Sequence, residues 1–111
     1  MTLDIRLKKE KDFNLVFKKG NRLFSHSLTV IYYKEECIKA GFAVSKKHGG
    51  AVKRNRIKRL LRESFRSFVP FLGKNFFFVF IPKVKSEYSL SDFKSNMNYL
   101  FKKGGFLDEN A

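Results

Sequence analysis

The residues of this sequence that could do chemistry are mainly cations, and they gather in one segment, KKHGGAVKRNRIKRLLRESFR, from Lys46 to Arg66. The only acid in the segment is Glu63. A guanidinium presents a planar fork of donors and an ammonium presents a compact charge, so both bind phosphate well. The segment therefore predicts a surface that binds a polyanion.

Most of this segment has the pattern of an amphipathic helix that runs from Val52 to Val69 and stops at Pro70. At about 100° per residue, one sector collects the apolar side chains: Ile57, Leu60, Leu61, Phe65 and Phe68. The opposite sector collects Asn55, Lys58, Arg59, Arg62 and Arg66, with Arg56 at its edge. A solvated helix face usually mixes both signs of charge, whereas like charges four residues apart cost roughly 0.2–0.5 kcal/mol. This face therefore favours a binding role over simple solubility.

The start of this helix carries Lys53, Arg54 and Arg56, although a helix N-terminus favours acidic residues. A local preference that is broken without a local gain points to function. Free N–H groups at a helix N-terminus bind phosphate, so we expect a phosphodiester backbone to dock there, close to Gly49-Gly50. Arg54 is expected to project past the edge of the sheet. Asn55 fits two roles equally, a contact with a nucleotide or a cap of the helix.

The whole chain has 111 residues and a formal net charge of +14, and it contains 14 Phe. This length predicts one domain, residues 1–111, and the charge favours nucleic acid as partner over an anionic membrane surface. Cys37, expected to be buried, allows no internal disulfide, and His26 and His48, expected at the surface or in a loop, form no zinc pattern with it. The acids are scattered, which predicts neither a metal site nor catalytic residues. Without a signal-like N-terminus or an apolar membrane span, the expected location is the cytoplasm.

The first half of the chain reads as a helix followed by a pair of strands. Arg6–Lys19 has helical spacing of its apolar residues and is followed by Gly20. Arg22–Lys34 alternates as a strand, and beyond the polar tip Glu35-Glu36 a second strand, Cys37–Ser45, is expected to pair with it.

The second half reads as helix, strand and helix. After the loop 46–51 and the basic helix, Asn75–Ile81 has no polar alternation and predicts a strand buried on both faces. Ser91 or Asp92 starts a last helix that Gly104-Gly105 ends. Its apolar face consists of Phe93, Met97, Leu100 and Phe101. The order helix, two or three strands, helix, strand, helix predicts an α+β two-layer sandwich.

Two stretches of the sequence resemble a known family. GFAVSKKHGGAVKRNRIKRLLRE and RLKKEKDFNLVFKKG resemble the protein subunit of bacterial ribonuclease P. The resemblance implies a fold like the second domain of ribosomal protein S5, with a left-handed crossover around the central helix. It also implies two partners, a catalytic RNA and the precursor tRNA whose 5′ leader that RNA removes. The complex would require Mg²⁺ held mainly by the RNA, and the chain alone would not be catalytic.

The resemblance also assigns roles to residues. It implies RNA contacts by Lys46, Lys47, Arg54, Asn55, Arg56, Lys58, Arg59 and Arg62, and Lys53 joins them through its place at the cationic helix start. Phe13 and Phe17 match aromatic residues of the first helix that line a cleft for the leader. The cleft tyrosine of the family falls at Ile31 without gaps, so Tyr32 or Tyr33 replaces it with a shift, or the contact is absent. Tyr33 is favoured because it shares a strand face with Ile31.

Other interpretations remain open from the sequence. Phe13 and Phe17, four residues apart, also fit an ordinary core. A ribosomal or general RNA-chaperone protein would have the same composition. A DNA-binding helix fits less well, since aromatic clefts and sheet-based folds suit single-stranded RNA. A membrane-surface helix would need the apolar face that the core requires.

Overall fold

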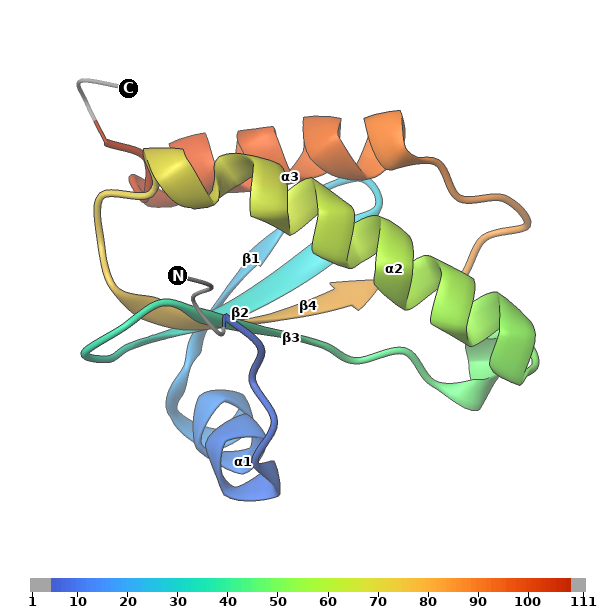
Figure 1. The fold of residues 1–111 in the computed structure, drawn as a ribbon, viewed down its shortest axis with the longest axis horizontal. Coiled ribbons are helices and arrows are strands. Elements are labelled where there is room, and N and C mark those ends of the chain that lie inside the picture. Colours follow the sequence, from blue (N-terminus) through green and yellow to red (C-terminus); the bar gives the residue numbers. More distant parts are fainter. Residues whose placement is uncertain (1–4, 109–111) are drawn as a thin grey trace.

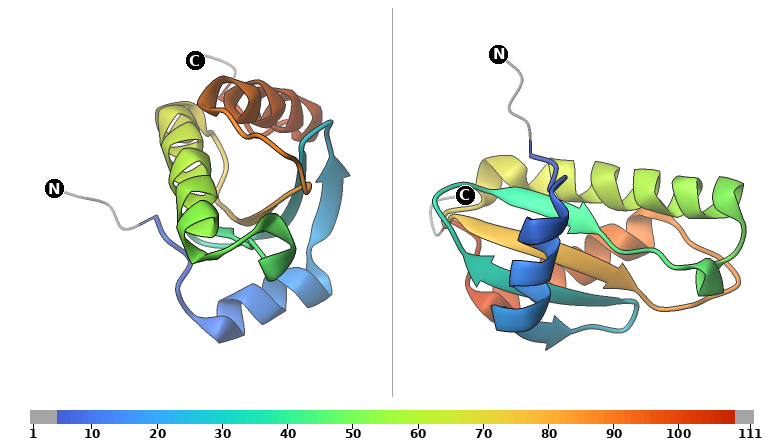
Figure 2. Two further views of the ribbon diagram at one scale, coloured as in Figure 1. Left: turned by 90° about the vertical axis from the view of Figure 1, so that its right-hand side faces the viewer. Right: turned by 90° about the horizontal axis from the view of Figure 1, so that it is seen from below.

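The computed structural model describes residues 5–108 and contains one four-stranded sheet with helices on both faces (Figure 1). The elements are α1 (Glu10–Lys19), β1 (Asn21–Phe24), β2 (Leu28–Lys34), β3 (Lys39–Phe42), α2 (Ala51–Phe68), β4 (Phe76–Pro82) and α3 (Leu90–Gly104). Two short 3-10 turns, η1 (Lys46–His48) and η2 (Val69–Phe71), flank α2. The helices α2 and α3 cover one face and α1 crosses the other (Figure 2). The α+β class is confirmed, but α1 adds a partial third layer to the predicted two.

The segment predicted as one strand over Arg22–Lys34 is two antiparallel strands, β1 and β2. The chain turns between them at residues 25–27, where Ser25 Oγ hydrogen-bonds the backbone of Leu28. The backbone N–H of Ser27 donates to Asn96 Oδ1 of α3 at 2.9 Å. Serine side chains that bond their own backbone favour turns, and this is the signal that overrides the strand pattern.

The predicted hairpin between the second and third strands is wrong. The sheet order is β1-β2-β4-β3, so β4 lies between β2 and β3 and pairs with β3 in parallel. The reason is burial, because the unbroken apolar run of β4 needs cover on both faces and therefore a central place. The path from β3 through α2 to β4 is a left-handed crossover in the two figures, as the resemblance implies and against the usual rule.

The first helix starts at Glu10, four residues later than predicted. Residues 5–9 instead lie beside the outer edge of β3, where Arg6 forms a parallel bridge with Ala40. The N–H of Leu7 donates to the carbonyl of Ala40, and the N–H of Ala40 donates to the carbonyl of Ile5. An unpaired strand edge offers backbone groups that an extended segment satisfies, and burial of Leu7 adds to the gain.

Two apolar clusters hold the layers together, one on each face of the sheet. The larger lies under α2 and α3, where Phe65, Phe78 and Phe101 meet edge to face or tilted, with ring centroids 5.7–6.2 Å apart. The apolar faces predicted for these two helices are confirmed. The smaller cluster lies under α1 and contains Val16 and Ile31.

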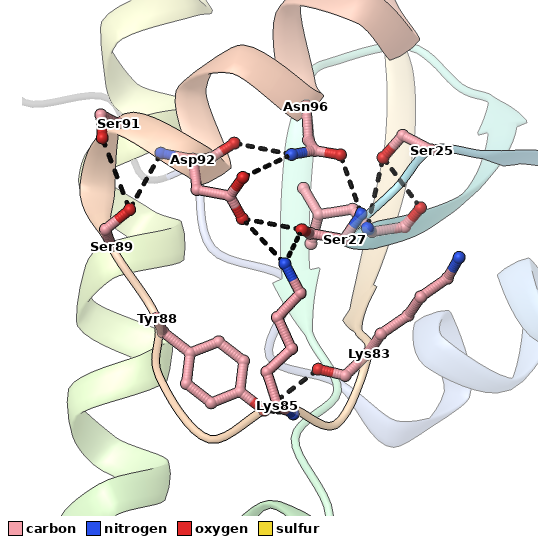
Figure 3. Close-up of polar contacts among 10 residues, drawn as sticks. Ser25, Ser27, Lys83, Lys85, Tyr88, Ser89, Ser91, Asp92 and Asn96 are labelled. Atoms are coloured by element: carbon pink, nitrogen blue, oxygen red, sulfur yellow. Dashed lines mark hydrogen bonds and ion pairs between the residues drawn. The ribbon is translucent and has the colours of Figure 1, made fainter.

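A polar network fixes the β1–β2 turn to α3 (Figure 3). Asp92 accepts a 2.7 Å hydrogen bond from Ser27 Oγ and lies 3.3 Å from the ammonium of Lys85, which also donates to Ser27. The hydrogen bond from Ser27 and the nearby ammonium of Lys85 lower the pKa of Asp92, whereas its partial burial acts in the opposite direction and raises it. The helix begins at the cap Ser89, two residues before the predicted start, and ends at Gly105 in the left-handed conformation.

Candidate nucleic-acid interface

The start of α2 is uncapped and cationic. Its N-cap is Gly50, no side chain caps the helix, and the first turn contains no acid. The first N–H groups of any helix lack intrahelical acceptors, so here they face solvent or a ligand. Asn55 lies in the second turn and is exposed, so it is no cap of this helix. Its predicted role as a cap is therefore wrong, and its contact with a nucleotide stays a prediction.

The loop before α2 is held from inside by His48. This side chain is buried, and its Nε2 lies 2.7 Å from the carbonyl of Pro82 at the end of β4. The N–H of Ser45 donates to Nδ1, which assigns the proton to Nε2. Of the two places expected for His48, the loop is confirmed and the surface is wrong, because an imidazole between two backbone groups can be buried at little cost. Lys46 and Lys47, which directly precede this anchor, are exposed.

The cations of α2 form two sets. Lys53, Arg56, Arg59 and Arg66 are exposed, together with Asn55. Arg54, Lys58 and Arg62 are half-buried and lie four residues apart in one row, so their stems pack while their charges stay accessible. The Nε atoms of Arg54 and Arg62 are covered and have no hydrogen-bond partner. Within residues 5–108 no salt bridge neutralises this row, which leaves its charges for an external anion.

The predicted leader face lies under α1 and is more closed than expected. Ile31 is 0% exposed, so it packs in the core and presents no surface to a nucleotide. Tyr32 points to the other face of the sheet, against Phe76 and Phe106. Tyr33 is half-buried beside the smaller cluster, which leaves it as the accessible tyrosine of β2 on the α1 side.

The two phenylalanines of α1 differ. The Phe13 ring lies on the backbone of Gly41 in β3, where an added Cβ would be 2.4 Å from ring atoms. Phe17 is 38% exposed one turn further along. Phe13 is therefore largely a packing residue, and Phe17 offers the free ring surface on this face.

His26 and Cys37 are both at the surface of the structure. His26 is exposed, as expected. Cys37, expected to be buried, is exposed in the turn before β3. In the described part of the chain no three His, Cys, Asp or Glu side chains come together to hold a metal. None of the helices within residues 5–108 is long and apolar enough to cross a bilayer.

The sequence did not predict the contact between α2 and the loop that precedes α3. The loop between β4 and α3 lies against the first half of α2, where it encloses a cavity of about 330 Å³. Tyr88 of this loop has Lys53 Nζ 5.9 Å from its ring centroid. Tyr88 is 35 residues from Lys53 in sequence, so no local motif predicts the contact, and only an aromatic residue in a polar loop hints at it.

An uncapped basic helix start on an α+β sheet scaffold is typical of proteins that bind nucleic acid. The family model described as Ribonuclease P matches residues 1–105, and the chain therefore belongs to the ribonuclease P protein family. The protein of this family is the non-catalytic component of the endoribonuclease that matures the 5′ end of tRNA.

Individual relatives agree with the family match. The ribonuclease P protein component of Finegoldia magna is 38% identical over 88 residues, which cover 78% of each chain. That of Bacillus pumilus is 38% identical over 109 residues, covering 94% of this chain and 91% of the relative. The solved Thermotoga maritima protein superposes with a TM-score of 0.78 at 30% identity, over 88% of this chain and 96% of that one. A solved Staphylococcus aureus protein superposes with a TM-score of 0.83 at 24% identity, over 96% of this chain and 100% of that one, and supports the fold.

Proposed function

We propose that this chain, as one RNA-binding domain over residues 1–111, holds the catalytic RNA of ribonuclease P against the start of α2. The contact surface consists of Lys46, Lys47, Lys53, Arg54, Asn55, Arg56, Lys58, Arg59 and Arg62. The observation that carries the proposal is the uncapped helix start with no acid in its first turn and several cations around it. Helix N–H groups and guanidinium forks together fit a phosphodiester backbone.

The second half of the proposal concerns the precursor tRNA. Phe17 and Tyr33 lie on the α1 side of the sheet, and we assign to them the contact with the 5′ leader. A partly exposed aromatic ring stacks on unpaired bases with little dependence on sequence, which suits leaders of many sequences. Phe13 and Ile31 lie beneath this face as packing residues. The ring of Phe13 packs on Gly41, and Ile31 is fully buried.

The metal requirement of the complex is assigned to the RNA. The described residues bring no carboxylate cluster together, so they do not fit as a Mg²⁺ cage of their own. Mg²⁺ keeps much of its water and commonly binds phosphates beside one or two carboxylates. The protein would act through its +14 charge, which lowers the repulsion between RNA phosphates that Mg²⁺ must otherwise screen. A complex that processes new transcripts is expected in the cytoplasm.

Reconstitution tests this function. The protein is mixed with its catalytic RNA, and cleavage of precursor tRNA is measured across a Mg²⁺ series, with each component alone as control. We expect the protein to shift the Mg²⁺ dependence to lower concentration and to cut nothing by itself. Cleavage by the pure protein, or an unchanged Mg²⁺ dependence, would contradict the proposal. The family match does not favour the alternative of a ribosomal or general RNA-chaperone protein.

A further inference from the structure

The cavity between α2 and the loop that precedes α3 combines features that recognise a nucleotide. Its volume is about 330 Å³, at the lower end of the range for small-molecule sites. Its lining consists of Lys53, Arg56, Ile57, Leu60, Ser86, Glu87 and Tyr88. It therefore offers two cations, an apolar floor from α2, an aromatic ring and one carboxylate within one small space.

Tyr88 is held in a fixed orientation. Its hydroxyl donates to the carbonyl of Lys83 at 3.0 Å and accepts from the N–H of Lys85 at 2.8 Å (Figure 3). Its ring stacks on Phe93, with centroids 5.8 Å apart and planes inclined by 28°. A ring fixed at its hydroxyl and by a stacked neighbour loses little entropy when a ligand stacks on it.

Lys53 lies over the same ring, 5.9 Å from its centroid, and it is exposed. A lysine side chain with four rotatable methylene groups can move off the ring and leave its ammonium at the mouth of the cavity. There it joins Arg56, which lies one turn further along α2. A planar base that replaces the ammonium on Tyr88 would thus keep two cations beside its phosphate.

Glu87 gives the cavity a preference among bases. It is exposed, and within residues 5–108 no salt bridge joins it to Lys53 or Arg56, so its oxygens are free to accept. A carboxylate accepts two parallel hydrogen bonds from adjacent donors. Guanine presents such a pair, N1–H and the exocyclic N2–H₂, whereas adenine, cytosine and uracil present no such pair on one edge.

We propose that this cavity binds one unpaired guanine nucleotide of an RNA, with the base on Tyr88, the guanine edge on Glu87 and the phosphate on Lys53 and Arg56. The proposal rests on the proposed function, because it extends the α2 surface to a base-reading pocket. It adds sequence preference to a surface whose cations contact phosphate, which carries no sequence information.

The test uses the full chain labelled with ¹³C at methyl groups, so that Ile57 and Leu60 report on the floor of the cavity. GMP, AMP, CMP and UMP are titrated separately, and the shifts of these methyl groups are followed by NMR. We expect GMP to shift both residues and to bind roughly 10-fold more tightly than the other three, less than two buried charge-assisted hydrogen bonds would give, because Glu87 is exposed to competing water.

Two variants assign the contacts. Glu87→Gln should remove the preference for GMP while leaving weak binding of all four nucleotides, and the matched control Glu36→Gln, in the turn before β3, should keep the preference. Tyr88→Leu should weaken all four by roughly 10-fold through lost stacking. Tyr88→Phe keeps the ring without the hydroxyl and should restore most of that loss, which separates stacking from a loosened loop.

The outcomes separate this pocket from the proposed function. If GMP shifts neither Ile57 nor Leu60, or if Glu87→Gln keeps the preference for GMP, the pocket proposal is wrong even when the catalytic RNA binds normally. If GMP binds as described but the catalytic RNA does not bind, the proposed function fails and the pocket stands as a mononucleotide site.

Discussion

The start of α2 and the face under α1 are both candidate RNA surfaces, but they are built in opposite ways. The α2 surface consists of charges that break local helix preferences and contribute little to the core. The α1 face consists of apolar side chains whose surface is mostly buried against the sheet. Ile31 is fully buried and Phe17 is only 38% exposed. A charged surface can therefore be altered at little cost to stability, whereas an aromatic surface is coupled to folding.

The strongest contrast is expected from Arg54→Ala combined with Arg56→Ala. Loss of two charge-assisted contacts should weaken binding of the catalytic RNA by about 100-fold or more. The salt dependence should become shallower, with the logarithmic slope falling by roughly 0.7 to 0.9 per contact. The melting temperature should stay equal or rise, because cations at a helix N-terminus are unfavourable. RNA affinity across a salt series and a thermal melt measure the three effects.

The matched control for this pair is Lys102→Ala with Lys103→Ala, an equal loss of charge in the last turn of α3. Cations favour a helix C-terminus, so this control should lower the melting temperature slightly and change RNA affinity far less. If the Arg54/Arg56 variant unfolds readily yet binds RNA normally when folded, the α2 cations are structural.

Phe13→Ala tests the coupling of the α1 face to folding. Its ring covers Gly41, so truncation should leave a gap between α1 and β3 and cost about 3 kcal/mol of stability. Denaturant unfolding measures this loss, and Phe13→Leu should recover part of it. A Phe13→Ala protein as stable as the wild type would show that α1 is not packed as described.

Phe17→Ala should separate binding from packing on the same face. Its partly exposed ring contributes less to stability than Phe13, but stacking on a leader base is worth roughly 1–3 kcal/mol. We therefore expect the preference of the reconstituted complex for precursor over mature tRNA to fall by about 10-fold or more. A folded variant with an unchanged preference would remove Phe17 from the leader contact.

Asp92 gives a smaller, pH-dependent effect away from both surfaces. Because its pKa in the folded chain is below the ordinary value of 3.8, its network stabilises the fold above pH 3.8. This contribution disappears as the pH falls through the folded pKa. Asp92→Asn should therefore melt lower than the wild type at pH 6, and the difference should shrink below pH 3.8. A difference that stays constant with pH would assign the effect to packing.

The smallest effect is expected at Cys37, which is exposed in the turn between β2 and β3. Figure 1 shows this turn at the opposite end of the sheet from the start of α2. A neutral thiol reagent on Cys37 should leave RNA affinity unchanged. The same reagent on Arg56→Cys, in a Cys37→Ser background, should reduce it strongly. Equal effects at both positions would mean that the RNA covers both ends of the molecule.

Local patterns predicted much of this fold. The apolar spacing of α2 and α3 and the continuous run of β4 each report burial directly, because burial acts on every residue of a regular element. The predicted bounds of helices and strands were wrong where side-chain hydrogen bonds or the unpaired edge of a strand changed the path of the chain. The turn at Ser27 and the extended segment at Arg6 both depend on partners far along the chain, Asn96 and Ala40.

The sequence by itself determined the charged helix start, since a broken local preference is visible in the order of residues alone. Only the tertiary structure decided the strand order, the burial of Ile31 and His48, and the meeting of Tyr88 with Lys53. These depend on contacts between segments far apart in the chain, and their energies come from shape and desolvation at the point of contact, which residue order does not encode locally.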